Sequence, residues 1–121
     1  MEKKEELEKI LEELGSFGDI VGAAIVRRDG LLIASRLPQN VNGGTVAAMA
    51  AAIVGTSETS AKELSIGEFN QVIVNATGGQ YISIGAGPEA IVIALLKTGA
   101  NLGLTLLEME RGAKRVARLI G

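Results

Sequence analysis

The chain contains no cysteine, no histidine and no tryptophan, and these absences exclude several kinds of site. Without cysteine there is no disulfide framework and no thiolate to bind a metal. Without histidine the chain lacks the commonest general base and the usual nitrogen ligand of zinc. We therefore expect no metal site and no bound cofactor.

Aromatic residues are also scarce, and the chain has no excess of positive charge. Aromatic residues make up 2% of the chain and the net charge is −2, whereas hydrophobic residues make up 47%. Proteins that bind nucleic acid usually present a basic surface, often with aromatic side chains that stack on bases. The composition therefore predicts an aliphatic core and no nucleic-acid partner.

No stretch of the sequence is long and apolar enough to predict a membrane span. The longest uncharged stretch, 37–57, contains Pro38, Asn40, Asn42 and several glycines, whereas a spanning helix needs about 20 apolar residues. The N-terminal segment EKKEELEK is unlike a signal peptide. We expect a cytoplasmic protein that does not insert into membranes, folded as one domain over residues 1–121.

Hydrophobic periodicity predicts eight elements in the order α-β-β-α-β-β-β-α. Two wholly apolar runs, IVGAAIV and AIVIALL, are typical of strands that are covered on both faces, so we place them in the middle of the sheet. Asn42 or Thr45 is expected to cap the middle helix and Asn101 the last one. The predicted ranges are 2–14, 20–26, 31–35, 45–64, 69–76, 80–85, 90–96 and 102–120.

Short turns join most of the predicted strands, which indicates an antiparallel sheet. Asp29-Gly30 is typical of a type I′ hairpin turn, in which both residues have positive φ. The strand 69–76 carries three side-chain amides and is expected near an edge. With the terminal helices on one face and the middle helix on the other, the sequence predicts a three-layer α/β domain with a five-stranded sheet.

The middle helix, 45–64, is unusual because it has no charged residue before Glu58. A surface helix normally keeps one charged face for water. Its bulkier side is expected on the core, while its opposite side is small and uncharged. Two interpretations follow: the helix is buried on both faces within one domain, or its small face contacts a second protein. The bulky side comprises Val46, Met49, Ala50, Ile53, Ser57, Ser60 and Leu64.

The sequence offers little that predicts catalysis or nucleotide binding. Residues 85–90, GAGPEA, match a loose dinucleotide pattern, but that motif requires a following helix, and here an apolar strand follows. The chain has no phosphate-binding loop of the G-x-x-x-x-G-K-[ST] type, and no histidine activates its serines. We therefore expect that it is not an enzyme.

Three segments together resemble the Roadblock / dynein-light-chain domain family. They are the hairpin GAAIVRRDGLLIAS, the uncharged Ala-rich helix and the closing KTGANLGLTLLEMERGAKRV. The bare chain is most similar to prokaryotic single-domain members, such as the bacterial polarity protein that binds a small Ras-like GTPase and stimulates GTP hydrolysis. This resemblance implies a profilin-like fold and a homodimer in which the middle helices lie side by side and the third strands pair.

On this basis we expect a non-catalytic homodimeric regulator or scaffold of a small Ras-like GTPase, which binds it through the paired middle helices. No arginine is obviously placed to reach a partner's active site, so any activation is expected to work by positioning the GTPase's own groups. The predicted GTPase-binding surface comprises Ala48, Ala51, Ala52, Gly55 and Thr59. The predicted dimer interface comprises Ala47, Val54, Glu58, Phe69, Gln71, Val72, Ile73, Val74 and Asn75.

Two alternatives remain open at this point. The first is a purely structural dimerisation module of a larger complex. The second is a small-molecule sensor, because profilin-like sheets also host ligand pockets. The scarcity of aromatic side chains and of convergent polar groups argues against a pocket.

Overall fold

A computed structural model describes residues 2–121, which form three helices and five strands in the predicted order. The elements are α1 (Glu2–Gly15), β1 (Ile20–Arg27), β2 (Leu32–Arg36), α2 (Gly43–Glu63), β3 (Gln71–Ala76), β4 (Gly79–Ala86), β5 (Ala90–Leu96) and α3 (Leu102–Ile120).

The strands form one antiparallel sheet with the order β2-β1-β5-β4-β3. The two wholly apolar strands, β1 and β5, are neighbours, with Ile25 opposite Val92, and β5 lies at the centre. Strand β3 is an edge strand whose Ile73 lies opposite Ile82 of β4. These placements confirm the predicted centre and edge of the sheet.

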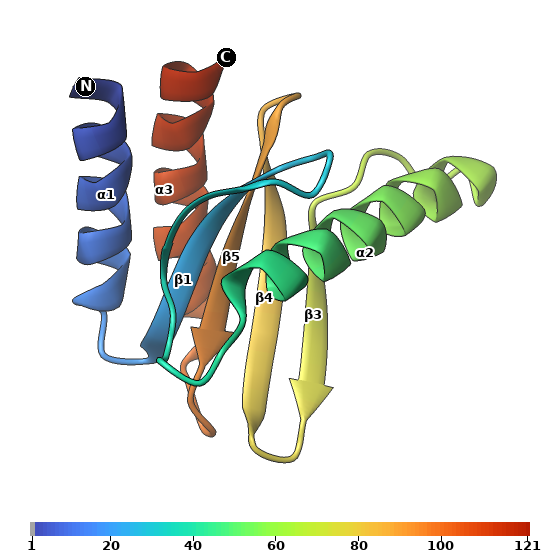
Figure 1. Ribbon diagram of the computed structural model, residues 1–121. Helices are drawn as coiled ribbons and strands as arrows, with labels where there is room; N and C mark the ends of the chain where they lie inside the picture. Colours follow the sequence, from blue (N-terminus) through green and yellow to red (C-terminus); the bar gives the residue numbers. More distant parts are fainter. Residues whose placement is uncertain (1) are drawn as a thin grey trace.

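The helices form two layers, one on each face of the sheet (Figure 1). Helices α1 and α3 lie side by side and share a buried cluster with Ile25, Ile82 and Val92. Helix α2 crosses the opposite face and packs on Ala24, Val26, Ile91 and Ile93. The central strands alternate between the two clusters, as expected for strands covered on both sides. The three-layer arrangement is confirmed.

Asparagine caps begin the two later helices. The Asn42 side chain accepts a hydrogen bond from the Thr45 N–H at 3.0 Å, and the Asn101 side chain accepts one from the Leu104 N–H at 3.1 Å. Each bond satisfies one of the free N–H groups of a first helical turn. The Asn101 N–H itself donates to the Asp19 carboxylate at 2.7 Å, and this bond holds the pKa of Asp19 below its usual value.

The β1–β2 connection differs from the predicted type I′ turn. Gly30 has a positive φ of 97°, but Asp29 does not, since Ser65 is the one non-glycine residue within 2–121 that has positive φ. The Arg27 N–H donates to the Leu31 carbonyl at 2.8 Å and the Gly30 N–H donates to the Arg27 carbonyl at 2.9 Å. The connection is therefore a three-residue loop that ends in a left-handed glycine.

The predicted core side of α2 is right for Val46 and Ala50, which pack toward the sheet, and wrong for Met49 and Leu64, which are exposed. The buried residues of this helix are Ala47, Ala50 and Val54, while Met49 is 53% exposed and Leu64 is 67% exposed. The helix is therefore rotated by about one residue, roughly 100°, from the predicted orientation. Ala47 and Val54, which were assigned to the dimer interface, pack in the chain's own core. Small side chains occupy the contact because they allow the helix to lie close to the sheet.

Candidate protein-interaction site

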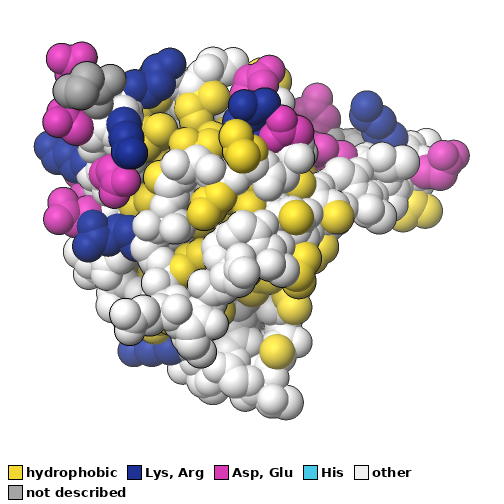
Figure 2. Space-filling view, viewed as in Figure 1, with side chains coloured by type: hydrophobic (Ala, Val, Ile, Leu, Met, Phe, Trp, Pro, Cys, Tyr) yellow, Lys and Arg dark blue, Asp and Glu magenta, His cyan; other side chains and the backbone are white. Residues whose placement is uncertain are grey.

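The outer side of α2, which faces away from the sheet, is uncharged and composed of small residues as far as Thr59. Ala48, Ala52, Gly55 and Thr59 are exposed, and Ala51 is half-buried. Charged side chains gather over α1 and near the far end of α2, whereas the first turns of α2 carry none (Figure 2). A broad, shallow hollow lies on this side, lined in part by Ala52, Gly55 and Thr59. We call the five predicted residues Ala48, Ala51, Ala52, Gly55 and Thr59 the platform.

One flank of α2 faces the β1–β2 turn of its own chain. A Cβ atom on Gly30 would lie 3.5 Å from the Ala48 Cα, so this turn borders the platform. On the same flank the Arg28 guanidinium donates to the Glu58 carboxylate at 2.5 Å. Glu58, which was assigned to the dimer interface, therefore has an intramolecular partner.

The other flank of α2 carries Met49, Ile53 and Thr56, which helical geometry places opposite the flank that meets the turn. Met49 and Thr56 are exposed and Ile53 is half-buried. Sequence reasoning missed Met49 and Ile53 as surface residues because it assigned their bulk to the core. The residues of α2 that are buried are Ala47, Ala50 and Val54. Their side chains are too small to predict a core face from the sequence.

Strand β3 presents an unprotected edge. Within the described chain it pairs with β4 on one side, and its sequence, QVIVNA, contains no lysine and no proline. Edge strands usually carry such residues, which prevent pairing with other chains. Ile73 and Val74 are both more than one-third exposed, on opposite faces of the sheet. Gln71 and Asn75 are also exposed, whereas Phe69 and Val72 are half-buried.

The C-terminal part of α2 projects beyond β3, at the edge of the sheet (Figure 1). Val54 is the last buried residue of this helix, and none of residues 55–63 is buried. Leu64 is 67% exposed and Ile66 is 72% exposed at its end. Within residues 2–121, this end of the helix therefore has no buried contact with the core. We call residues 59–66 the overhang.

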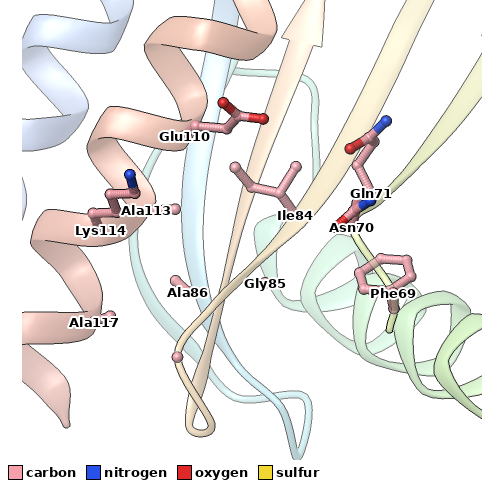
Figure 3. A pocket seen from close by; sticks show the side chains of 11 residues that line it. Phe69, Asn70, Gln71, Ile84, Gly85, Ala86, Glu110, Ala113, Lys114 and Ala117 are labelled. Atoms are coloured by element: carbon pink, nitrogen blue, oxygen red, sulfur yellow. The ribbon is translucent and has the colours of Figure 1, made fainter. Parts of the chain in front are cut away.

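A separate crevice lies on the other face of the sheet, between α3 and the start of β3 (Figure 3). Its volume is about 280 Å³, and its walls include Phe69, Gln71, Ile84 and Glu110. Ligand pockets usually enclose roughly 300–1,000 Å³ and are rich in aromatic side chains. This crevice is smaller and has one aromatic wall, so it gives no support to the small-molecule sensor.

The described residues offer no reactive centre near the platform. No cluster of carboxylates that could hold a metal ion occurs within residues 2–121. Tyr81 lies on the α2 face of β4, opposite Val74, and burial raises the pKa of its hydroxyl while the nearby Ser83 hydroxyl acts in the opposite direction. Nor is any helix in this part of the chain long and apolar enough to cross a membrane. What the site offers is contact surface.

Comparisons with known proteins agree with this geometry. A family model described as the Roadblock/LC7 domain matches residues 6–97. An uncharacterized protein of Methanocaldococcus jannaschii is 36% identical over 110 residues, which cover 91% of this chain and 96% of the relative. Both matches span the platform and β3.

Two solved structures have the same fold. MglB of Myxococcus xanthus is 17% identical and superposes with a TM-score of 0.90, covering 100% of this chain and 95% of the other. Profilin IB of Acanthamoeba castellanii is 15% identical and superposes with a TM-score of 0.64, covering 93% of this chain and 97% of the other. The fold is therefore profilin-like, as the family resemblance implied.

Proposed function

Because the chain belongs to the Roadblock/LC7 domain family, we propose that it is a non-catalytic homodimer that regulates or scaffolds a small Ras-like GTPase through its paired α2 helices. The observation that carries this proposal is the platform, an uncharged and exposed helix surface beside an unprotected strand edge. Membership of the family and the likeness in fold to MglB support a GTPase as the partner.

The widths of the layers support the dimer. Strands β1, β4 and β5 are seven or eight residues long, about 23–26 Å, whereas α2, which crosses the strands, is about 10 Å across. Two helices, α1 and α3, cover one face, but within residues 2–121 the other face has α2 alone. That face therefore has room for a second helix, and an identical chain has one to offer.

Pairing of β3 with its twin across a two-fold axis would fill this room. Such a two-fold rotation would place each overhang above the other protomer's β3, on the flank of Met49 and Ile53. Leu64 and Ile66 would then bury their exposed side chains against Val74 of the partner subunit. The same arrangement pairs the open backbone edges of β3, which a lone protomer leaves available to any other strand.

The platform remains exposed in this dimer, because it lies on the side of α2 away from the sheet. Small side chains let the backbone of a partner approach closely, and the absence of charge avoids the cost of desolvating ions. The platform provides no catalytic group of its own. Any stimulation of GTP hydrolysis would therefore arise from positioning the GTPase's own groups.

The test is to titrate the purified protein with each small Ras-like GTPase of its source organism, loaded with GDP or with a non-hydrolysable GTP analogue. We expect micromolar or tighter binding of one GTPase, with a preference for one nucleotide state. A stable dimer that binds none of them in either state would refute the proposal and favour a purely structural dimerisation module.

A further inference from the structure

Arg28 joins three elements that are distant in sequence. Its Nε and one terminal nitrogen donate to the Gly87 carbonyl in the β4–β5 turn, at 3.3 and 3.0 Å. Its other terminal nitrogen donates to the Glu58 carboxylate on α2 at 2.5 Å. Its backbone N–H donates to the Glu89 carbonyl at 3.0 Å. The planar guanidinium suits this role because its donors point in fixed, divergent directions.

Gly85 leaves the space that the guanidinium occupies. A Cβ atom at position 85 would lie 2.8 Å from an Arg28 terminal nitrogen, closer than real Cβ contacts allow. Any other residue at this position would displace the arginine from β4. The side chain is also partly shielded from water, since Arg28 is 27% exposed and Glu58 is 37% exposed. Partial shielding makes such an ion pair stronger than one at the open surface.

The position of Glu58 on α2 gives this contact its importance. Glu58 lies one turn after Val54, the last residue of the helix that the core holds. Among residues 2–121, the Arg28–Glu58 pair is the one salt bridge that α2 makes. Beyond Glu58 come Thr59 of the platform and the overhang. Within the described chain, this pair is therefore the last polar side-chain contact between the body of the domain and its projecting helix.

We propose that Arg28 is a positioning residue, which fixes the angle at which the C-terminal part of α2 leaves the sheet. This angle sets where the overhang meets a second copy of the chain and how Gly55 and Thr59 are presented to a partner. The links to a second copy and to a GTPase rest on the proposed function, but the positioning of the helix does not.

Hydrogen exchange of backbone amides tests the proposal on the intact protein. In Glu58→Gln and in Arg28→Gln, we expect amides of residues 56–64 to exchange faster by about five- to tenfold, while those of β1 and β5 change little. Arg27→Gln is the matched control, because Arg27 pairs with Asp29 inside the turn and does not contact α2. It should leave exchange in residues 56–64 unchanged.

A double variant separates positioning from general destabilisation. If the two side chains act through each other, Arg28→Gln with Glu58→Gln should accelerate exchange no more than the stronger single variant. Arg28→Lys should give an intermediate effect, because lysine can pair with Glu58 but lacks the fork that also reaches Gly87. Should Arg28→Gln fold poorly, Glu58→Gln carries the test alone, since it removes the charge and keeps the shape.

The outcomes are distinct from those of the proposed function. Unchanged exchange of residues 56–64 in Glu58→Gln would overturn the positioning role, as would equal acceleration throughout the chain. Neither result depends on whether a GTPase binds. Conversely, failure of every GTPase to bind the unaltered protein would remove the proposed partner and leave the positioning of α2 intact.

Discussion

Gly55→Arg separates the platform from the dimer interface more sharply than any other single change. Gly55 is exposed in the interior of α2, and a Cβ atom added there would have no atom within 4 Å. Helical geometry places it on the outer side of α2, away from the flank of Met49 and Ile53. An arginine at this position can therefore extend into solvent without disturbing the core.

The variant should be more stable than the unaltered protein. Glycine in a helix interior is less favourable than arginine by about 0.8 kcal/mol. With an unfolding entropy of about 2.1 cal/mol/K per residue, a chain of 121 residues should gain about 3 °C in melting temperature. Calorimetry measures this gain, and light scattering should show the dimer mass unchanged.

Binding of the GTPase should be lost in the same variant. The long side chain keeps the partner's backbone away from α2, and its charge would be desolvated in the contact at a cost of several kcal/mol. A loss of about 4 kcal/mol changes micromolar affinity to millimolar affinity. Gly55→Ala is the control, since it stabilises the helix by a similar amount but adds a single methyl group, and it should still bind.

Two results would contradict this reasoning. A monomeric Gly55→Arg would place the residue in the homotypic interface instead of the platform. A dimeric Gly55→Arg that binds the GTPase as tightly as Gly55→Ala would refute the platform itself. Titration calorimetry with the nucleotide-loaded GTPase distinguishes the second case from the expected one.

Two further predictions concern the dimer and the response to acid. Met49→Asp places a charge on the flank where the twin helix is proposed to lie, so light scattering should report a folded monomer, and an unchanged dimer mass would contradict the proposed interface. The pKa of Asp19 is lowered, chiefly because the Asn101 N–H donates a hydrogen bond to its carboxylate. The contribution of Asp19 to stability is therefore complete above the unfolded-state pKa of about 3.9. It is lost as the pH falls through the lower folded-state pKa. In urea titrations, the excess stability of the unaltered protein over Asp19→Asn should therefore be constant above about pH 5 and shrink below about pH 4; a difference that does not change with pH would contradict this role.

Local sequence patterns predicted the order of elements and both layers, because each pattern reports on contacts near in the chain. The continuous apolar runs of β1 and β5 report burial on both faces, and the structure pairs these strands at the centre of the sheet. Asn42 and Asn101 indicate where two helices begin, because an amide side chain can accept a hydrogen bond from a free N–H group of the first turn. Such signals need no knowledge of distant residues.

The orientation of α2 could not be predicted from bulk alone. The rule that larger apolar side chains face the core assumes one core and one solvent side. Here the contact with the sheet is made by Ala47, Ala50 and Val54, while Met49 is exposed on a flank of the helix. As a result, Met49 was predicted in the core although it is exposed, and Ala47 and Val54 were predicted in the dimer interface although they are buried.

The role of Arg28 was invisible in the sequence for a different reason. Its partners Glu58 and Gly87 are 30 and 59 residues away, and they meet only because the β4–β5 turn and α2 converge on the β1–β2 turn. The residues adjacent to Arg28 indicated a hairpin and nothing more. The need for glycine at position 85 could not be predicted either, because it depends on the Arg28 guanidinium that occupies the space beside it.

The distribution of charge along α2 gives the strongest argument that the platform has an occupant of its own. The uncharged stretch ends at Ser57, and Glu58, Lys62 and Glu63 follow in the part of the helix that approaches and passes the sheet edge. If contact with the sheet and the twin helix were the whole reason for the missing charge, the outer side would remain free to carry lysine or glutamate, as surface helices do. Instead Ala48, Ala52 and Gly55 are exposed there without charge. The sheet accounts for one side of α2 and the proposed twin for a second, so the uncharged outer side supports the proposal that a further protein binds there.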